Sequence, residues 1–208
     1  MDSSLRRAAI TAIITVTALC LIELFDRVLQ LELYRFGVYP RSLSDLPNIL
    51  SAPLIHGSWN HVLSNSFPLI ILLTALLYAY PRSAIPSLAL IYIGSGICVW
   101  LFARESYHYG ASGLTHGMMF YIFTSGILRR DRRSIALSMI VFFLYGGMIW
   151  SIFPQEPGIS YESHFFGAAA GVIAAFAFSR RDPAPRKKHY DWEDEDAADD
   201  TDPQRDEQ

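Results

Sequence analysis

Charged residues are scarce over most of this 208-residue chain; they make up 18% of it and are gathered in short clusters. Long apolar runs lie between the clusters, and hydrophobic residues account for 51% of the chain. The mean hydropathy is positive, at +0.23. A soluble domain with charge spread over its surface is therefore excluded, and the composition is that of a membrane protein.

Cysteine and clustered metal-binding residues are also scarce. Cys20 and Cys98 both lie inside apolar runs, so we expect two small buried residues and no disulfide. His56 and His61 are five residues apart, which is off the same-face spacing of a helix. No His-Glu-x-x-His motif and no carboxylate cluster occurs in the apolar runs, which disfavours a metal-dependent hydrolase. We expect no metal and no cofactor, and nothing indicates nucleic-acid binding.

Six apolar runs are each about as long as a helix that crosses ~30 Å of hydrocarbon. They are residues 8–25, 62–80, 85–103, 112–128, 134–153 and 163–179. We predict an all-α membrane protein with six transmembrane helices. The first run lacks a small-x-small cleavage site, because Glu23 and Phe25 occupy that region, and is expected to be a retained helix. A small transporter stays open as an alternative, although no internal repeat supports it.

Basic residues in the connections predict the orientation. With six crossings, the termini and the even-numbered connections share one side, and that side carries 13 of the 17 Lys and Arg residues. Both termini are therefore expected to be cytoplasmic, in the cytoplasmic (inner) membrane of a bacterium. The connection over residues 26–61 is unusually apolar for a linker. It is interpreted either as amphipathic segments at the membrane interface or as an ordinary packed extracytoplasmic loop.

The chain changes character near its end. Residues 1–181 form the predicted membrane domain. Residues 182–208 hold 11 of the 20 acidic residues and almost no aliphatic ones. This composition predicts a disordered cytoplasmic tail.

A serine between glycines, in the sequence 110–113, opens the fourth run. Taken alone, such small residues are typical of helix packing in membranes. The predicted topology adds polar residues at the same depth, however: His61 and Asn65 begin the second run, and His164 begins the sixth. Buried polar groups on three helices at one depth indicate a shared, water-accessible cavity.

Such a cavity would contain the groups that nucleophilic catalysis needs. Ser112 requires an adjacent base, and histidine titrates in the right pH range for that role. A tetrahedral intermediate requires hydrogen-bond donors directed at its oxyanion. Asn65, His61 and the backbone N–H of Ser112 are candidates for these donors.

These three motifs, in this order and in these runs, resemble a rhomboid intramembrane serine protease. The resemblance covers residues 8–179 and implies a six-helix rhomboid-like bundle with a Ser–His dyad, in which Ser112 is the nucleophile and His164 the general base. It implies that His61 and Asn65, with Gly110 beside them, support the oxyanion. It also implies that the partners are the lipid bilayer and transmembrane proteins, which are cleaved in or near their spans. The alternative is a catalytically inactive rhomboid-like protein that binds transmembrane helices.

Two departures from the family pattern concern the site. Many rhomboids have a tyrosine four residues after the serine, where this chain has His116. His116 could stack against His164 as the tyrosine does, or compete with it as the base. The Trp-Arg pair often found in the first outer connection is not evident here. His56 matches a family histidine and is interpreted as structural.

Two pairs of glycines follow helical spacing in the fourth and sixth runs. Gly113 with Gly117, and Gly167 with Gly171, are each four residues apart. Each pair forms a small-xxx-small face, which favours close helix packing. We expect these faces to bring the serine and the histidine within reach of each other.

Overall fold

The structure is a computed structural model that describes residues 3–154 and 158–183 of the chain. The described residues form six α-helices and five short 3₁₀ helices. Across these residues there is no β-strand, only an isolated bridge between Val38 and His108. The α-helices are α1 (Ser3–Leu29), α2 (Trp59–Ala79), α3 (Ala84–Phe102), α4 (Ser112–Arg129), α5 (Arg132–Tyr145) and α6 (Tyr161–Phe178). The prediction of an all-α, six-helix bundle is confirmed.

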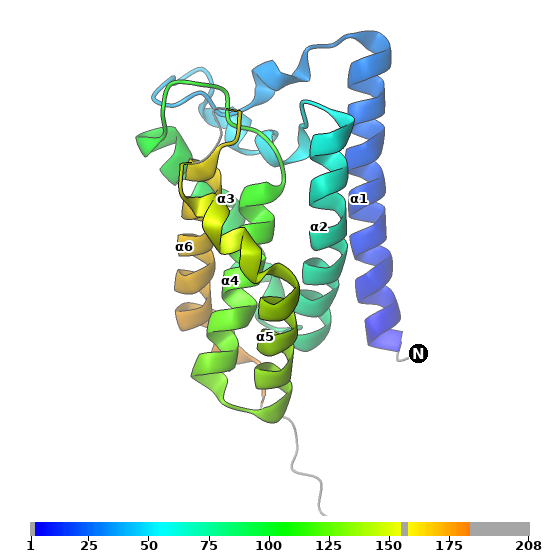
Figure 1. Cartoon of the computed structure of the whole chain (residues 1–208), viewed down its shortest axis with the longest axis vertical. Helices are drawn as coiled ribbons and strands as arrows, with labels where there is room; N and C mark the ends of the chain where they lie inside the picture. Colours follow the sequence, from blue (N-terminus) through cyan, green and yellow to red (C-terminus); the bar gives the residue numbers. More distant parts are fainter. Residues whose placement is uncertain (1–2, 155–157, 184–208) are drawn as a thin grey trace, which may run out of the picture.

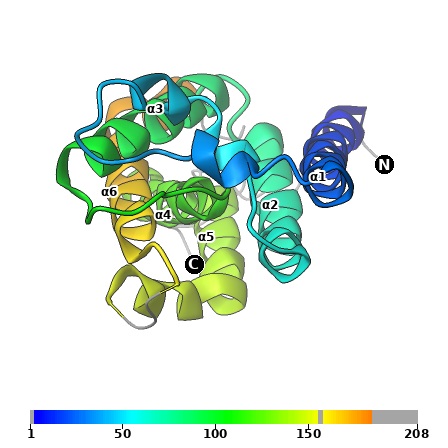
Figure 2. The same cartoon turned by 90° about the horizontal axis from the view of Figure 1, so that it is seen from above.

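Five segments of the described chain are long and apolar enough to cross a membrane, and α4 is not among them. The reason lies in the position of α4, which stands in the middle of α2, α3, α5 and α6 when the bundle is seen from above (Figure 2). More than half of its residues are buried by these neighbours. A helix enclosed by protein needs no apolar surface towards lipid, so polar residues are tolerated on it.

The fifth predicted helix differs from the expectation. It was expected to be continuous over residues 134–153, but the α-helix ends at Tyr145 and a 3₁₀ helix, η4 (Gly146–Ile152), follows. The change occurs at Gly146 and Gly147, where the lack of a side chain makes the α-helical conformation entropically costly. The tighter 3₁₀ turns carry Ser151 to the end of the bundle where α2, α4 and α6 begin.

Helices α4 and α6 are in close backbone contact. A Cβ atom added to Gly167 would lie 2.1 Å from the carbonyl oxygen of Gly113, and one added to Gly171 would lie 2.1 Å from that of Gly117. Real Cβ atoms do not approach so closely. Only glycine therefore permits this separation of the two helices.

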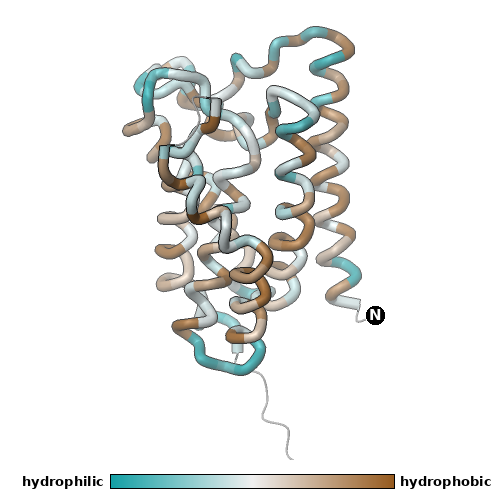
Figure 3. The backbone as a smooth tube through the Cα atoms, viewed as in Figure 1, coloured by the Kyte–Doolittle hydropathy of each residue, from teal (hydrophilic) through white to brown (hydrophobic). Residues whose placement is uncertain are grey.

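The connection between α1 and α2 crosses the upper end of the bundle in Figure 1 and contains η1 (Leu33–Phe36), η2 (Leu46–Ile49) and η3 (Ala52–Leu54). One face of it is packed, because Val38 and Ile49 are buried together with Val99 of α3. The other face is apolar and open, with Leu43 78% exposed. Figure 3 shows hydrophobic residues along the helices and the strongly hydrophilic ones gathered towards the two ends.

The lower end of the bundle is closed by the segment after α6, which begins with η5 (Ser179–Arg181). Asp182 is buried there and accepts hydrogen bonds from the backbone N–H groups of Arg82 (2.8 Å) and Ser83 (3.2 Å) and from the Ser83 hydroxyl. Asp182 is the first residue of the predicted tail. Residues 184–208 lie outside the described residues, so the disorder of the tail stays a prediction.

Candidate active site

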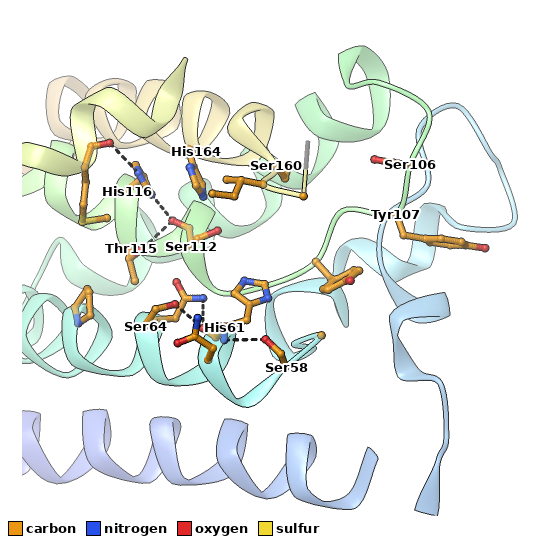
Figure 4. Close-up of a pocket in the computed structure, with 18 of the residues that line it drawn as sticks. Ser58, His61, Ser64, Ser106, Tyr107, Ser112, Thr115, His116, Ser160 and His164 are labelled. Atoms are coloured by element: carbon orange, nitrogen blue, oxygen red, sulfur yellow. Dashed lines mark hydrogen bonds between the residues drawn. The ribbon is translucent and has the colours of Figure 1, made fainter. Parts of the chain in front are cut away.

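A cavity of about 720 Å³ opens at the upper end of the bundle and is lined from α2, α4, α6 and the connections beside them. Ser112, His164, His61, Asn65 and His116 all contribute to its wall. In Figure 4, Ser112 lies between the rings of His116 and His164 on one side and the ring of His61 on the other. Residues from three helices that were predicted to share one depth therefore share one cavity.

Ser112 is the first residue of α4 and is half-buried. Its carbonyl oxygen accepts hydrogen bonds from the Thr115 hydroxyl (2.9 Å) and from Nδ1 of His116 (2.7 Å). The backbone N–H groups of the first turn of a helix have no partner within the helix, and they form its positive end. The start of α4 thus offers backbone donors beside the serine hydroxyl.

His164 lies in the first turn of α6 and is buried. Its Nδ1 is 2.9 Å from the carbonyl oxygen of Ser151. A carbonyl only accepts hydrogen bonds, so in the neutral ring the proton resides on Nδ1. Nε2 is then left without a proton and can accept one.

His116 is stacked on His164, with ring centroids 4.1 Å apart and planes inclined by 8°. Both of its nitrogens are engaged, Nδ1 with the Ser112 carbonyl oxygen (2.7 Å) and Nε2 with the Ser151 hydroxyl (2.8 Å). Ser151 therefore contacts both histidines, one through its hydroxyl and the other through its carbonyl. Ser151 is not among the residues predicted from the sequence, because its place beside both histidines depends on the change from α-helix to 3₁₀ helix at Gly146.

His61 lies on the opposite side of Ser112, against the backbone of Gly110. A Cβ atom at Gly110 would be 2.7 Å from Nε2 of His61, and the Gly110 φ of +115° is one that other residues rarely adopt. Both facts require glycine at this position. Asn65 is buried one turn further along α2, and its Nδ2 donates to the His61 carbonyl oxygen at 3.1 Å.

His56 supports the same region from behind. Its Nε2 accepts a hydrogen bond from the backbone N–H of Ala111 (3.4 Å), and its ring centroid is 4.9 Å from that of His61. Burial, together with the proximity of His61, lowers the pKa of His56 from its ordinary 6.5 to about 4. His56 is therefore neutral at physiological pH, so it can accept the Ala111 N–H.

His108 ties the connection before α4 to the start of α6, a link that the sequence analysis did not find. Its Nδ1 is 2.6 Å from the Ser160 hydroxyl, and its Nε2 is 2.9 Å from the Arg104 carbonyl oxygen. Burial lowers the pKa of His108. The Ser160 hydroxyl also accepts the backbone N–H of Ser163 as the N-cap of α6 (3.2 Å). The segment that carries Ser112 and the helix that carries His164 are thus joined directly.

The family model of the Rhomboid domain matches residues 44–181. The chain belongs to the rhomboid family. Among the relatives of this rhomboid chain, an uncharacterized protein of Mycobacterium tuberculosis is 32% identical over 188 residues, which are 86% of this chain and 77% of the relative. An uncharacterized protein of Mycobacterium leprae is 29% identical over 188 residues, 86% of this chain and 73% of the relative. Together with its apolar helices, membership of this rhomboid family makes the chain a multi-pass integral membrane protein.

Proposed function

We propose that this rhomboid is an intramembrane serine endopeptidase that cleaves transmembrane proteins in or near their membrane spans. The observation that carries the proposal is the hydrogen bond from His164 Nδ1 to the Ser151 carbonyl, at 2.9 Å, in a cavity that Ser112 also lines. This bond keeps the proton of the neutral ring on Nδ1, so Nε2 can accept the serine proton as the general base.

In the proposed reaction, Ser112 Oγ attacks the scissile carbonyl carbon while His164 Nε2 takes the hydroxyl proton. The resulting oxyanion is stabilised by the backbone N–H of Ser112 and by the side chains of His61 and Asn65. Collapse of this intermediate breaks the C–N bond, and His164 returns the proton to the leaving amine. Water then attacks the acyl-enzyme by the same route and releases the carboxylate product.

His116 is assigned a positioning role and not that of the base. Both of its ring nitrogens are held, by Ser112 and Ser151, whereas Nε2 of His164 is available. Its stacking on His164 restricts that ring to one orientation.

Purified protein in liposomes is expected to cleave a model transmembrane substrate. Ser112→Ala and His164→Ala should each lower the rate by about 10³-fold or more, because a nucleophile and its base act as one unit. The matched control is Ile173→Ala, which should cleave at the wild-type rate. Ile173 is 59% exposed on α6 and is not part of the cavity wall. Cleavage that survives in either site variant would contradict the assignment. Absence of cleavage in the wild type, together with binding of the substrate, would favour the inactive rhomboid-like alternative.

A further inference from the structure

Glu23 is a buried carboxylate in α1, with only 1% of its surface exposed. A buried acidic residue inside a membrane helix is costly and is usually retained for a purpose. Glu23 Oε1 accepts a hydrogen bond from Nε of Arg27, one turn later on the same helix, at 2.8 Å. Arg27 is the outer member of the pair, with its side chain 48% exposed.

The Arg27 guanidinium also makes a hydrogen bond outside α1. Its Nη2 donates a hydrogen bond to the carbonyl oxygen of Gly57, in the segment that leads into α2. A guanidinium presents its N–H groups in a rigid, planar fork, so holding Nε on Glu23 also fixes the direction of Nη2. Glu23 therefore orients the donor that reaches Gly57.

Gly57 lies between two residues that support the oxyanion side of the cavity. His56, before it, accepts the backbone N–H of Ala111, and Ser58, after it, caps α2 by accepting the backbone N–H of His61 at 3.1 Å. Gly57 is itself packed against Tyr109, whose hydroxyl would be 2.8 Å from a Cβ at Gly57. A shift of Gly57 would consequently displace both supports.

We propose that Glu23 and Arg27 are positioning residues of the active site, which hold segment 56–58 against segment 109–111 and so fix His61 behind Gly110. This inference rests on the proposed function. Both residues precede the part of the chain that the family model matches, which begins at residue 44. They make α1 a support of the catalytic centre in addition to a membrane span.

The test compares Glu23→Gln and Arg27→Gln with Arg35→Gln. Arg35 forms an ion pair with Glu32 in the connection after α1, but that pair is exposed, at 61% and 54%, and its hydrogen bonds do not involve segment 56–58. With a model transmembrane substrate in liposomes, the two α1 variants should lose about tenfold in kcat with little change in KM, because loss of remote positioning acts on the reacting geometry. Arg35→Gln should match the wild type. Equal kcat values in all three variants would overturn the proposal.

A second measurement does not depend on proteolysis. In a Ser112→Ala background, backbone hydrogen exchange of residues 55–61 should be faster in Glu23→Gln and Arg27→Gln than in Arg35→Gln, with the exchange of α4 unchanged. If the wild type cleaves nothing, the proposed function fails while this comparison still decides the positioning role. If Glu23→Gln is too unstable to purify, Arg27→Gln is compared with Arg35→Gln alone, because Arg27 is half-exposed and its replacement leaves no cavity in the core. Unaltered exchange in segment 55–61 would rule the positioning role out.

Discussion

At the scale of single residues, the site is distinguished by the two stacked histidines His116 and His164. The two rings differ in their hydrogen bonds. In His164 only Nδ1 is hydrogen-bonded, to the Ser151 carbonyl, whereas in His116 both ring nitrogens are hydrogen-bonded. This difference supports the proposal that His164 is the general base, a choice that sequence spacing alone left open.

We expect His116→Tyr to retain substantial activity, because a phenol ring can stack on His164 in the same way. His116→Ala, which removes the stacked ring, should reduce kcat by about threefold to tenfold, the equivalent of ~0.5–1.5 kcal/mol for an aromatic pair. Steady-state cleavage of a model transmembrane substrate measures both variants. A loss in His116→Tyr as complete as that in Ser112→Ala would instead identify His116 as the base.

At the scale of helices, the contact of α4 with α6 brings the serine and the histidine to one cavity. The glycine pairs and the polar starts of the helices could be recognised in the sequence, since both follow fixed spacings. The break in the fifth helix at Gly146 could not be located, because an apolar run has the same composition in an α-helix and a 3₁₀ helix. Ser151 was missed for the same reason: its place beside both histidines depends on that break.

Gly167→Ala should destabilise the bundle by about 1–3 kcal/mol or more, because the added methyl group would overlap the Gly113 carbonyl. The matched control is Gly94→Ala within α3, since a Cβ there would come no closer than 3.6 Å to another side chain. Thermal unfolding in detergent compares the two variants with the wild type. Equal unfolding temperatures for Gly167→Ala and Gly94→Ala would show that α4 and α6 are not held at this separation.

At the scale of the whole molecule, polar clusters close both ends of an apolar bundle. The lower cluster centres on Arg129 of α4, whose guanidinium donates to the carbonyl oxygens of Ser179 (2.6 Å) and Asp182 (2.7 Å). The Asp182 carboxylate in turn holds the turn between α2 and α3. The composition of the chain could place a boundary near residue 181, but it could not reveal this role of Asp182, since an acidic residue beside an acidic segment looks like part of it.

Truncation after Arg181 should therefore lower the unfolding temperature, whereas truncation after Pro183 should leave it unchanged. The shorter chain loses a buried carboxylate that accepts three hydrogen bonds, each worth about 1.5–3 kcal/mol when the group is charged. Thermal unfolding of the two truncated proteins in the same detergent makes the comparison. If both unfold at the same temperature, the Asp182 contacts do not contribute to stability.

The central claim is that His164 activates Ser112 as a nucleophile, and labelling with a fluorophosphonate tests it most directly. The reagent reacts with an activated serine, and mass spectrometry locates the adduct. The account predicts a single adduct on Ser112 in the wild-type protein and none in His164→Ala. An adduct on another serine, or labelling of Ser112 that is as fast in His164→Ala as in the wild type, would contradict it.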